Sequence, residues 1–384
     1  MTTPIRVLEL RSVRGTGGGP EKTILFGAAR SDPARVSVTV CYIRDTRDDI
    51  FAIGERARAL GLDYVEVLER GSFDPSIWAP LRGLVAERNI DIIHGHDYKT
   101  DLLTWLLAKR TRRMALSTAH GWAGLSPREQ RIYYPANKRL LARFPRVIAV
   151  SSRIRDELLR HGADPERVSV VLNGIDPTRY RRDEARVTRA RSALGLRPSD
   201  IALVTVGRLE AVKRFDLLIQ AFSDVHRARP DCRLLIAGEG SERQALEAER
   251  DRHNLGEHGV FLGHVGDPTD LYHAADLFVQ SADSEGTPNA VLEAMAFEVP
   301  VVATDAGGTR EVLRDAVDGI IVPTGRVETL AAALRTVLAN PMEARMRVKS
   351  ARHRIETDLA FETRMRRVEA IYEELIARPA QAAG

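Results

Sequence analysis

Two carboxylates lie close to a predicted helix N-terminus in the second half of the chain. Glu285 follows the apolar segment 276–280, which is typical of a buried strand, and Glu293 lies within the helix-favouring segment 290–297. Backbone amides at the start of that helix would suit an anion, and the carboxylates would accept hydrogen bonds from hydroxyl groups. Alternatively, Glu293 is an ordinary surface residue, and the loop that precedes the helix is an ordinary turn. The loop consists of Gly286, Thr287, Pro288 and Asn289.

Two cations follow another strand-like segment of the second half. Arg208 comes shortly after the apolar segment 201–206, and Lys213 lies five residues further along, at the start of a helical segment. A guanidinium offers a two-pronged donor and an ammonium a point charge, so the pair suits a diphosphate. Turns after two later strands are candidate walls of a pocket for a nucleoside base. The residues proposed for that pocket are Gly238, Leu262, His264 and Val265.

A glycine-rich segment, residues 14–22, follows the first strand-like segment. Its glycines would let the backbone approach a ligand closely, and Pro20 and Glu21 favour the start of a helix. As a dinucleotide-binding fingerprint the segment is poor, because Pro20 occupies the third glycine position. A nicotinamide-type cofactor is therefore disfavoured.

Histidines mark the ends of two further strands in the first half. His94 and His96 belong to one such end and His120 to another, so both groups are expected to point toward a ligand. They could bind a metal, but no typical Cys/His/Asp spacing accompanies them, and no Asp-x-Asp motif follows a suitable strand. We therefore predict no metal. Hydrogen-bonding or packed rings are the alternative, which is stronger for His94 than for His120.

Strand-like and helical segments alternate along the whole chain. The predicted strands of the first half are 5–10, 36–42, 64–68, 90–94, 114–118, 147–150 and 168–172. Those of the second half are 201–206, 233–237, 259–262, 277–280, 299–303 and 319–322. Helical segments between them predict an α/β protein with two doubly wound, mostly parallel sheets in tandem. Ligands bind outside the carboxyl ends of such strands, so two facing domains would enclose a cleft.

The length of 384 residues exceeds that of a usual single core and also indicates two domains. A charged segment of low apolar content, 176–197, marks the join. We predict an N-terminal domain at 1–176, a linker at 177–198 and a C-terminal domain at 199–359. The last helical segment, 363–377, lies beyond the final strand and has no further strand to connect to.

Composition favours a cytoplasmic protein. Cys41 and Cys232 lie in strand-like segments of different halves, so they predict no disulfide framework and a reducing compartment. No apolar segment approaches the roughly 18 to 20 residues of a membrane-spanning helix. Arg6 and Glu9 interrupt the first apolar segment, which is therefore not a signal peptide.

Charge is distributed unevenly between the halves. Residues 1–200 contain 35 lysines and arginines against 24 acidic residues, whereas residues 201–384 contain 22 against 29. Much of the excess lies within 101–150, where the basic segment 109–113 follows the apolar segment 102–107. Such an element suits peripheral contact with an anionic membrane or an anionic acceptor. A solvated helix end is the alternative, because cations stabilise a helix C-terminus.

Six motifs, in order along nearly the whole chain, resemble the retaining glycosyltransferases of family 4, which have the GT-B fold. They are Gly18-Gly19 with Glu21, His120, Asn173-Gly174-Ile175-Asp176, Gly207-Arg208-Leu209 with Lys213, Glu285-Gly286 with Pro288-Asn289 and Glu293, and Gly307-Gly308 with Glu311. The resemblance implies two Rossmann-like domains facing a central cleft, with the final helix, about 360–384, returning to the N-terminal domain. Pro20 departs from the family, which usually has another small or apolar residue there.

The resemblance also implies roles for the matching residues. Arg208 and Lys213 would bind the diphosphate of a UDP- or GDP-sugar, a donor substrate rather than a cofactor. Glu285 would lie by hydroxyls of the donor sugar and Glu293 by the ribose. The glycine loop, Gly18 and Gly19, would reach the phosphates, and His120 would lie near the transferred sugar. The implied catalytic residues are His120, Arg208, Lys213 and Glu285.

The expected reaction moves a hexose-type sugar to a hydroxyl of a glycan or lipid-linked acceptor, in envelope or extracellular polysaccharide synthesis. Cleavage of the sugar–diphosphate bond places negative charge on the phosphates, which cations and helix N-termini can stabilise without a metal. Retention would follow from same-face attack by the acceptor. A sugar-nucleotide epimerase of the same fold and a non-catalytic donor-binding subunit remain alternatives. Nucleic acid is not an expected partner, because no recognition module accompanies the basic residues.

Overall fold

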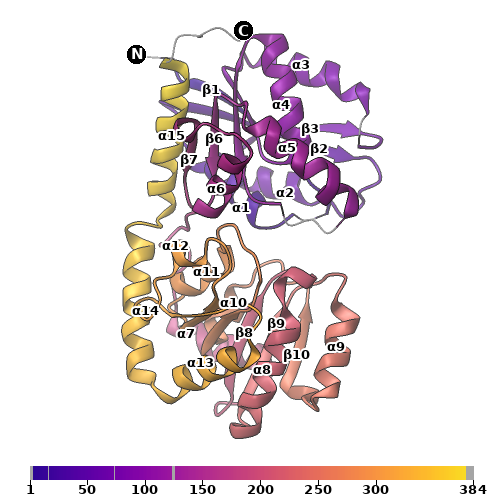
Figure 1. Cartoon of the computed structure of the whole chain (residues 1–384). Coiled ribbons are helices and arrows are strands. Elements are labelled where there is room, and N and C mark those ends of the chain that lie inside the picture. The colour runs from indigo at the N-terminus through magenta and orange to yellow at the C-terminus, as the bar shows by residue number, and fades with distance from the viewer. Residues whose placement is uncertain (1–2, 16, 73, 123–125, 378–384) are drawn as a thin grey trace. The chain divides into compact units, whose positions relative to one another are not determined.

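The computed structural model describes residues 3–15, 17–72, 74–122 and 126–377. It divides into two compact units, shown in Figure 1. The first comprises Met1–Asn173 with Glu362–Gly384, and the second comprises Gly174–Phe361. The predicted return of the C-terminal helix to the first domain is confirmed. Residues 378–384 of that prediction, and Thr16 of the glycine-rich segment, lie outside the described residues.

The first unit is built on a seven-stranded parallel sheet with the order β3-β2-β1-β4-β5-β6-β7. Its strands are apolar over most of their length because helices cover both faces. The register of β1 and β4 places Glu9 opposite His94. The strands are β1 (Ile5–Ser12), β2 (Val36–Asp45), β3 (Asp63–Glu69), β4 (Ile92–Gly95), β5 (Met114–Ala119), β6 (Arg146–Ala149) and β7 (Val168–Val170).

Two groups of helices enclose this sheet. On one face Leu81, Leu107, Leu141 and Leu158, from four successive helices, form the core with the strands. On the other face the C-terminal helix packs on the central strands, and its residues Val368, Ile371, Tyr372 and Leu375 contact Val7, Ile92, Leu116 and Ile148. The helices of the unit are α1 (Gly19–Arg30), α2 (Ile53–Ala59), α3 (Trp78–Glu87), α4 (Tyr98–Thr111), α5 (Tyr134–Leu141), α6 (Ser152–Arg160) and α15 (Phe361–Ala377).

The second unit contains a six-stranded parallel sheet with the order β10-β9-β8-β11-β12-β13. Its strands are β8 (Ile201–Val206), β9 (Cys232–Ala237), β10 (Gly259–Gly263), β11 (Leu277–Gln280), β12 (Val301–Thr304) and β13 (Ile320–Val322). Its helices are α7 (Glu184–Ala193), α8 (Phe215–Ala228), α9 (Arg243–Arg252), α10 (Thr269–Ala274), α11 (Asn289–Ala296), α12 (Thr309–Val312), α13 (Val327–Ala339) and α14 (Pro341–Glu356). Each predicted strand of both halves corresponds to a strand of the structure.

The predicted linker, 177–198, is wrong. This segment contains α7 and belongs to the second unit, where Arg186 pairs with Asp270 at 2.7 Å and Arg191 pairs with Asp276 at 3.0 Å. The charges that suggested a solvated linker instead attach α7 to α10 and to the start of β11.

Two predicted helices also differ from the structure. From its sequence, segment 48–60 favours a helix, but the helix begins only at Ile53, because the Asp48 carboxylate accepts hydrogen bonds from the backbone amides of Gly15 and Ile50. Segment 127–142 also favours one helix from its sequence, but it is divided, since a π-helical turn, Glu129–Tyr133, precedes α5.

Candidate functional site

Strand order reverses at one point in each sheet, between β1 and β4 in the first unit and between β8 and β11 in the second. Ligands of open α/β sheets bind at the carboxyl ends of the strands at such points. The sequence-predicted residues lie at these ends in both units. His94 lies in the last part of β4, and His96 and His120 follow β4 and β5, whereas Arg208, Lys213 and Glu285 follow β8 and β11.

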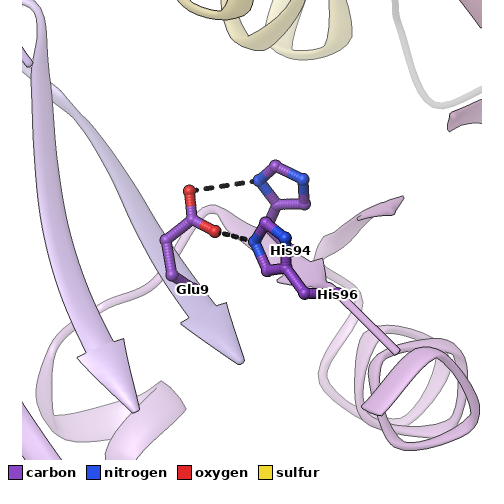
Figure 2. A group of neighbouring side chains, drawn as sticks. All are labelled: Glu9, His94 and His96. Carbon is purple, nitrogen blue, oxygen red and sulfur yellow. Dashed lines mark hydrogen bonds and ion pairs between the residues drawn. The ribbon is translucent and has the colours of Figure 1, made fainter. Parts of the chain in front are cut away.

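The Glu9 carboxylate faces two neighbouring imidazoles at the reversal point of the first sheet (Figure 2). The Nδ1 atom of His94 is 3.2 Å from Oε1 of Glu9, and Nε2 of His96 contacts Oε2. The two histidines can face the same carboxylate because residues i and i+2 at the end of a strand point to the same side. All three side chains are buried.

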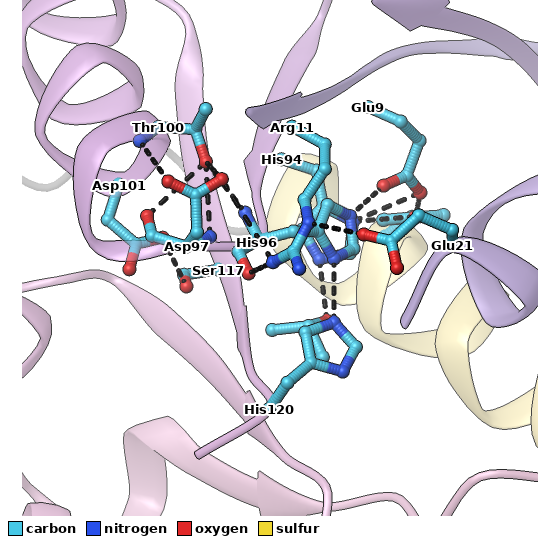
Figure 3. A network of polar contacts seen from close by, with 12 residues as sticks. Glu9, Arg11, Glu21, His94, His96, Asp97, Thr100, Asp101, Ser117 and His120 are labelled. Carbon is cyan, nitrogen blue, oxygen red and sulfur yellow. Dashed lines mark hydrogen bonds and ion pairs between the residues drawn. The ribbon is translucent and has the colours of Figure 1, made fainter. Parts of the chain in front are cut away.

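Residues from two other elements complete this cluster. Tyr372 of α15 donates a hydrogen bond from its hydroxyl to Oε1 of Glu9 at 2.9 Å. Nε2 of His94 lies 2.8 Å from the Thr118 hydroxyl, so the prediction of a buried, hydrogen-bonded His94 is confirmed. Nδ1 of His96 lies 3.1 Å from Nε2 of His120, which is only half-buried (Figure 3). The C-terminal helix therefore helps to build the site of the first unit.

Burial and hydrogen bonding determine the charges of the cluster. Burial opposes ionisation of Glu9, yet attraction to His94 and His96 and their hydrogen bonds hold its pKa well below 4.5. Burial lowers the pKa of His96 to about 4, although Glu9 opposes this effect. Burial also places the pKa of His120 well below 6.5, and His96 and Arg11 lower it further. At neutral pH the cluster therefore contains one carboxylate and neutral His96 and His120 rings.

The same cluster has a donor set that a cation could use. Glu9, His94 and His96 each offer one ligand atom, and these atoms lie within 4.8 Å of one another. However, both Glu9 oxygens and the ring nitrogens that face them already take part in hydrogen bonds with His94, His96 and Tyr372. A cation would replace these bonds rather than add to them.

The glycine-rich loop is held by an ion pair next to the cluster. Arg11 pairs with Glu21 at 2.9 Å and also donates to the backbone carbonyl of His96. The other oxygen of Glu21 accepts the amide of Gly18 at 2.5 Å, which caps α1. The start of this helix is therefore connected to the histidine cluster through Arg11 (Figure 3).

A second buried carboxylate, Asp101 of α4, lies near the same strand ends. Its oxygens accept hydrogen bonds from the Ser117 hydroxyl at 2.6 Å and from the Asn137 amide at 2.7 Å. Burial raises the pKa of Asp101 to about 7, although these two hydrogen bonds oppose the rise. Asn137 in turn accepts from the indole of Trp122 at 2.9 Å, so Asp101 connects α4, β5 and α5.

Asp101 is expected to make the stability of the first unit depend on pH. Its folded-state pKa of about 7 exceeds the usual 3.8, so its stabilising contribution is complete below about pH 4 and is lost as the pH rises toward 7. The asparagine of Asp101→Asn does not titrate, so the free energy of unfolding of this variant should fall less steeply with pH. The difference in slope should be up to about 1.4 kcal/mol per pH unit. Urea unfolding at pH 5, 6 and 7 tests this, followed by fluorescence of Trp78, Trp105 and Trp122, which all lie in the first unit. Equal pH slopes for the two proteins would contradict the prediction.

In the second unit, the loop after β8 packs directly on the turn after β9. A Cβ atom on Gly238 would lie 1.8 Å from the carbonyl oxygen of Gly207, and its φ of +152° also favours glycine. The Gly238 amide donates to the carbonyl of Gly263 at 2.8 Å. Of the predicted base-pocket residues, Gly238 therefore follows β9, Leu262 lies near the end of the adjacent β10, and His264 and Val265 follow β10.

Lys213 and Glu285 meet at the reversal point of the second sheet. Lys213 ends a short 3-10 turn, Ala211–Lys213, and its ammonium donates to Glu285 at 2.5 Å, with both side chains largely buried. Gly307 packs against this loop, because a Cβ atom there would lie 2.0 Å from the Glu285 carbonyl oxygen and its φ is +58°. Arg208, whose side chain is 67% exposed, pairs with Glu210.

Glu293 lies within α11 and is buried. Its carboxylate accepts a hydrogen bond from the Tyr272 hydroxyl at 2.9 Å, and the Tyr272 ring stacks on Phe297. The surface alternative for Glu293 is therefore wrong. Gly286, Thr287 and Pro288 form the loop that precedes the helix, whereas Asn289, which was predicted in that loop, is the first residue of the helix.

Sequence reasoning missed four residues of the first-unit cluster, namely Glu9, Arg11, Asp101 and Tyr372. A charge inside a segment that otherwise resembles a buried strand was the available signal for Glu9, and His-x-His at a strand end was the signal for a shared carboxylate. Tyr372 gave no such signal, because its contact with Glu9 joins distant parts of the chain.

Within the described part of the chain, each helix is too short or too polar to cross a lipid bilayer.

Comparisons with known proteins agree with this architecture. A family model described as Glycosyltransferase Family 4 matches residues 17–179, and one described as Glycosyl transferases group 1 matches residues 187–354. A D-inositol 3-phosphate glycosyltransferase of Rhodococcus erythropolis is 29% identical over 371 residues, which cover 88% of this chain and 83% of the relative.

Solved structures show the same fold. The structure of Anabaena HepE in complex with UDP-glucose has a TM-score of 0.84 at 22% identity, and the alignment covers 96% of this chain and all of that one. Sucrose-phosphate synthase from Thermosynechococcus elongatus has a TM-score of 0.82 at 21% identity, covering 97% and 99% of the two chains.

Proposed function

We propose a donor and an acceptor for this chain, which belongs to the glycosyltransferases of group 1 and family 4 and has the GT-B fold. It moves a hexose-type sugar from a nucleotide-diphosphate sugar to a hydroxyl of a glycan or lipid-linked acceptor, with retention of anomeric configuration. The main support for this proposal is the ion pair between Lys213 and Glu285 at the reversal point of the second sheet. An envelope or extracellular polysaccharide is the proposed product.

The second unit is the proposed donor-binding unit. Lys213 and Arg208 bind the diphosphate, and Glu285 accepts hydrogen bonds from the sugar while it orients the Lys213 ammonium. Complexes of Anabaena HepE with UDP and with UDP-glucose support a uridine nucleotide as the first candidate, with a GDP-sugar as the second.

The cations are proposed to stabilise the departing diphosphate without a metal. Negative charge develops on that group in the transition state, where fixed positive charges in a partly buried site lower the barrier. The acceptor hydroxyl then attacks the face from which the diphosphate leaves, which retains configuration. His120 of the first unit contacts the transferred sugar in this proposal.

A donor screen tests the assignment. Thermal shifts of the full-length protein with UDP-, GDP- and ADP-sugars should show one stabilised class, because a ligand that binds only the folded state raises its melting temperature. Incubation of that donor with no acceptor separates the alternatives, since an epimerase would consume it and a transferase would not. A donor-binding subunit would bind the same ligand but show no turnover with any acceptor.

The first unit is proposed to contact anionic lipid through α4. Leu102 and Leu106 are 43% and 40% exposed on one face of this helix, and the exposed Lys109 and Arg110 follow them. Apolar insertion together with basic residues is the usual basis of peripheral binding, and its electrostatic part weakens with salt.

Replacement of both leucines with serine is therefore expected to reduce sedimentation with anionic vesicles at low salt by about tenfold. Met342→Ser with Met346→Ser is the matched control, because these exposed residues have the same spacing on α14 of the second unit. If the parent protein does not sediment with such vesicles, the membrane proposal is abandoned.

A further inference from the structure

Glu9, His96 and His120 form a hydrogen-bonded line from the core of the first unit to a half-buried edge (Figure 3). The carboxylate of Glu9 contacts Nε2 of His96, and Nδ1 of His96 lies 3.1 Å from Nε2 of His120. The His96 and His120 ring centroids are 5.4 Å apart with 30° between the ring planes. This spacing fits a contact between ring edges, with a nitrogen of each ring facing the other.

The order of donors and acceptors, starting from the Glu9 carboxylate, determines which nitrogen of each ring carries the proton. A carboxylate can only accept, so the proton of the first hydrogen bond lies on Nε2 of His96. A neutral imidazole has a single N–H, which leaves Nδ1 of His96 as an acceptor. The proton of the second bond therefore lies on Nε2 of His120, and Nδ1 of His120 carries a free electron pair.

Surrounding contacts favour this direction. Tyr372 donates to the second oxygen of Glu9, which stabilises the ionised carboxylate. His96, Arg11, Arg364 and His94 each disfavour a positive charge on the His120 ring. Among the described residues, none forms a hydrogen bond with Nδ1 of His120, which faces away from His96 in Figure 3.

We propose that Glu9 and His96 are positioning residues that hold His120 as the Nε2–H tautomer, so that its Nδ1 accepts a hydrogen bond from a substrate hydroxyl. The pair acts through His120 and does not touch substrate itself. The ligand in this inference rests on the proposed function, whereas the tautomer is a property of the protein alone.

Nuclear magnetic resonance of the full-length protein with ¹⁵N-labelled histidine tests the tautomer directly. We expect a proton on Nε2 of His120, an unprotonated Nδ1 on the same ring, and a scalar coupling across the hydrogen bond to Nδ1 of His96. His120→Gln and His96→Gln assign the two rings. A proton on Nδ1 of either His96 or His120, or the absence of the coupling, would overturn the inference. So would stoichiometric zinc in the purified protein whose removal by a chelator changes these resonances.

The kinetics of sugar transfer test whether His96 positions His120 for the reaction. In His96→Gln the amide can still donate to Glu9, but the acceptor that Nδ1 of His96 offers to His120 is lost. We therefore expect kcat to fall about tenfold with little change in donor KM. His96→Asn places an amide oxygen near the former Nδ1 position and should recover part of the loss. The matched control is His94→Gln, which perturbs the same carboxylate but leaves the contact between His96 and His120.

The outcomes separate a positioning role from a structural one. Equal losses of kcat and of melting temperature in His96→Gln and His94→Gln, with no recovery in His96→Asn, would overturn the positioning role. If no donor is turned over, the proposed function fails, and the resonance measurement still decides the tautomer.

Discussion

Lys213→Met is expected to lower kcat/KM for the donor sugar by about 100-fold or more. The substitution keeps an unbranched side chain that is one heavy atom shorter and removes the ammonium, which pairs with Glu285 and is placed to bind the diphosphate. Loss of one fixed charge that stabilises a developing anion commonly costs 10² to 10³ in rate. Calorimetry measures the change in affinity for the donor that the thermal-shift screen identifies. Initial-rate kinetics measure the change in transfer rate.

Stability must be separated from function in this variant. Removal of the ammonium leaves the largely buried Glu285 carboxylate without its ion pair, which should cost about 1–3 kcal/mol. Addition of Glu285→Gln should restore the melting temperature without restoring donor binding. Arg227→Met is the charge-matched control, because Arg227 lies on α8 of the same unit and pairs only at the surface with Asp224. Unchanged donor affinity in Lys213→Met would contradict the assignment of the second unit.

The strands were predictable because a parallel sheet covered on both faces requires continuous apolar segments. Residues 201–206 and 277–280 are of this type, and they agree in both bounds with β8 and β11. Helix bounds were less predictable where a side chain competes for backbone amides. Asp48 illustrates this, since its carboxylate caps the loop before α2 rather than the helix itself.

The charged segment before β8 shows the limit of composition as a guide to linkers. Its arginines resemble those of a solvated connection, but Arg186 and Arg191 pair with acidic residues more than 80 positions further along the chain. A single sequence does not indicate which distant carboxylate an arginine will meet. A helix as short as α10 is also difficult to predict, because its six residues are too few to establish a helical period.

In the candidate sites too, local sequence features were predictable, whereas contacts between distant residues were not. Residues that follow strands, such as Lys213 and His120, were accessible from the sequence because the ends of parallel strands gather at one edge. Their partners were not accessible, because Glu9 meets Tyr372 only after the C-terminal helix packs on the first sheet. The sequence predicted where ligands would bind, but not the hydrogen bonds that orient the side chains there.

Removal of α15 is expected to unfold the first unit. The side chains of Val368, Ile371, Tyr372 and Leu375 are each at most 5% exposed against the sheet. At about 1.5–3 kcal/mol for each buried side chain, their loss amounts to about 6–12 kcal/mol. That range is comparable with the whole stability of a typical domain, about 5–15 kcal/mol. A chain that ends at Phe361 should therefore lose the cluster around Glu9 together with the fold that positions it.

Hydrogen exchange distinguishes this outcome from general misfolding. In the shortened chain we expect amides of β1, β4 and β5 to lose protection, while those of β8, β11 and β12 keep it, because the residues removed, from Glu362 onward, belong to the first unit. A chain that ends at Ala377 retains the whole helix and serves as the control. Native tryptophan fluorescence in the chain ending at Phe361 would contradict the prediction, since all three tryptophans lie in the first unit. It would mean that the remaining helices suffice to hold the sheet, and that α15 contributes Tyr372 to the site without supporting the fold.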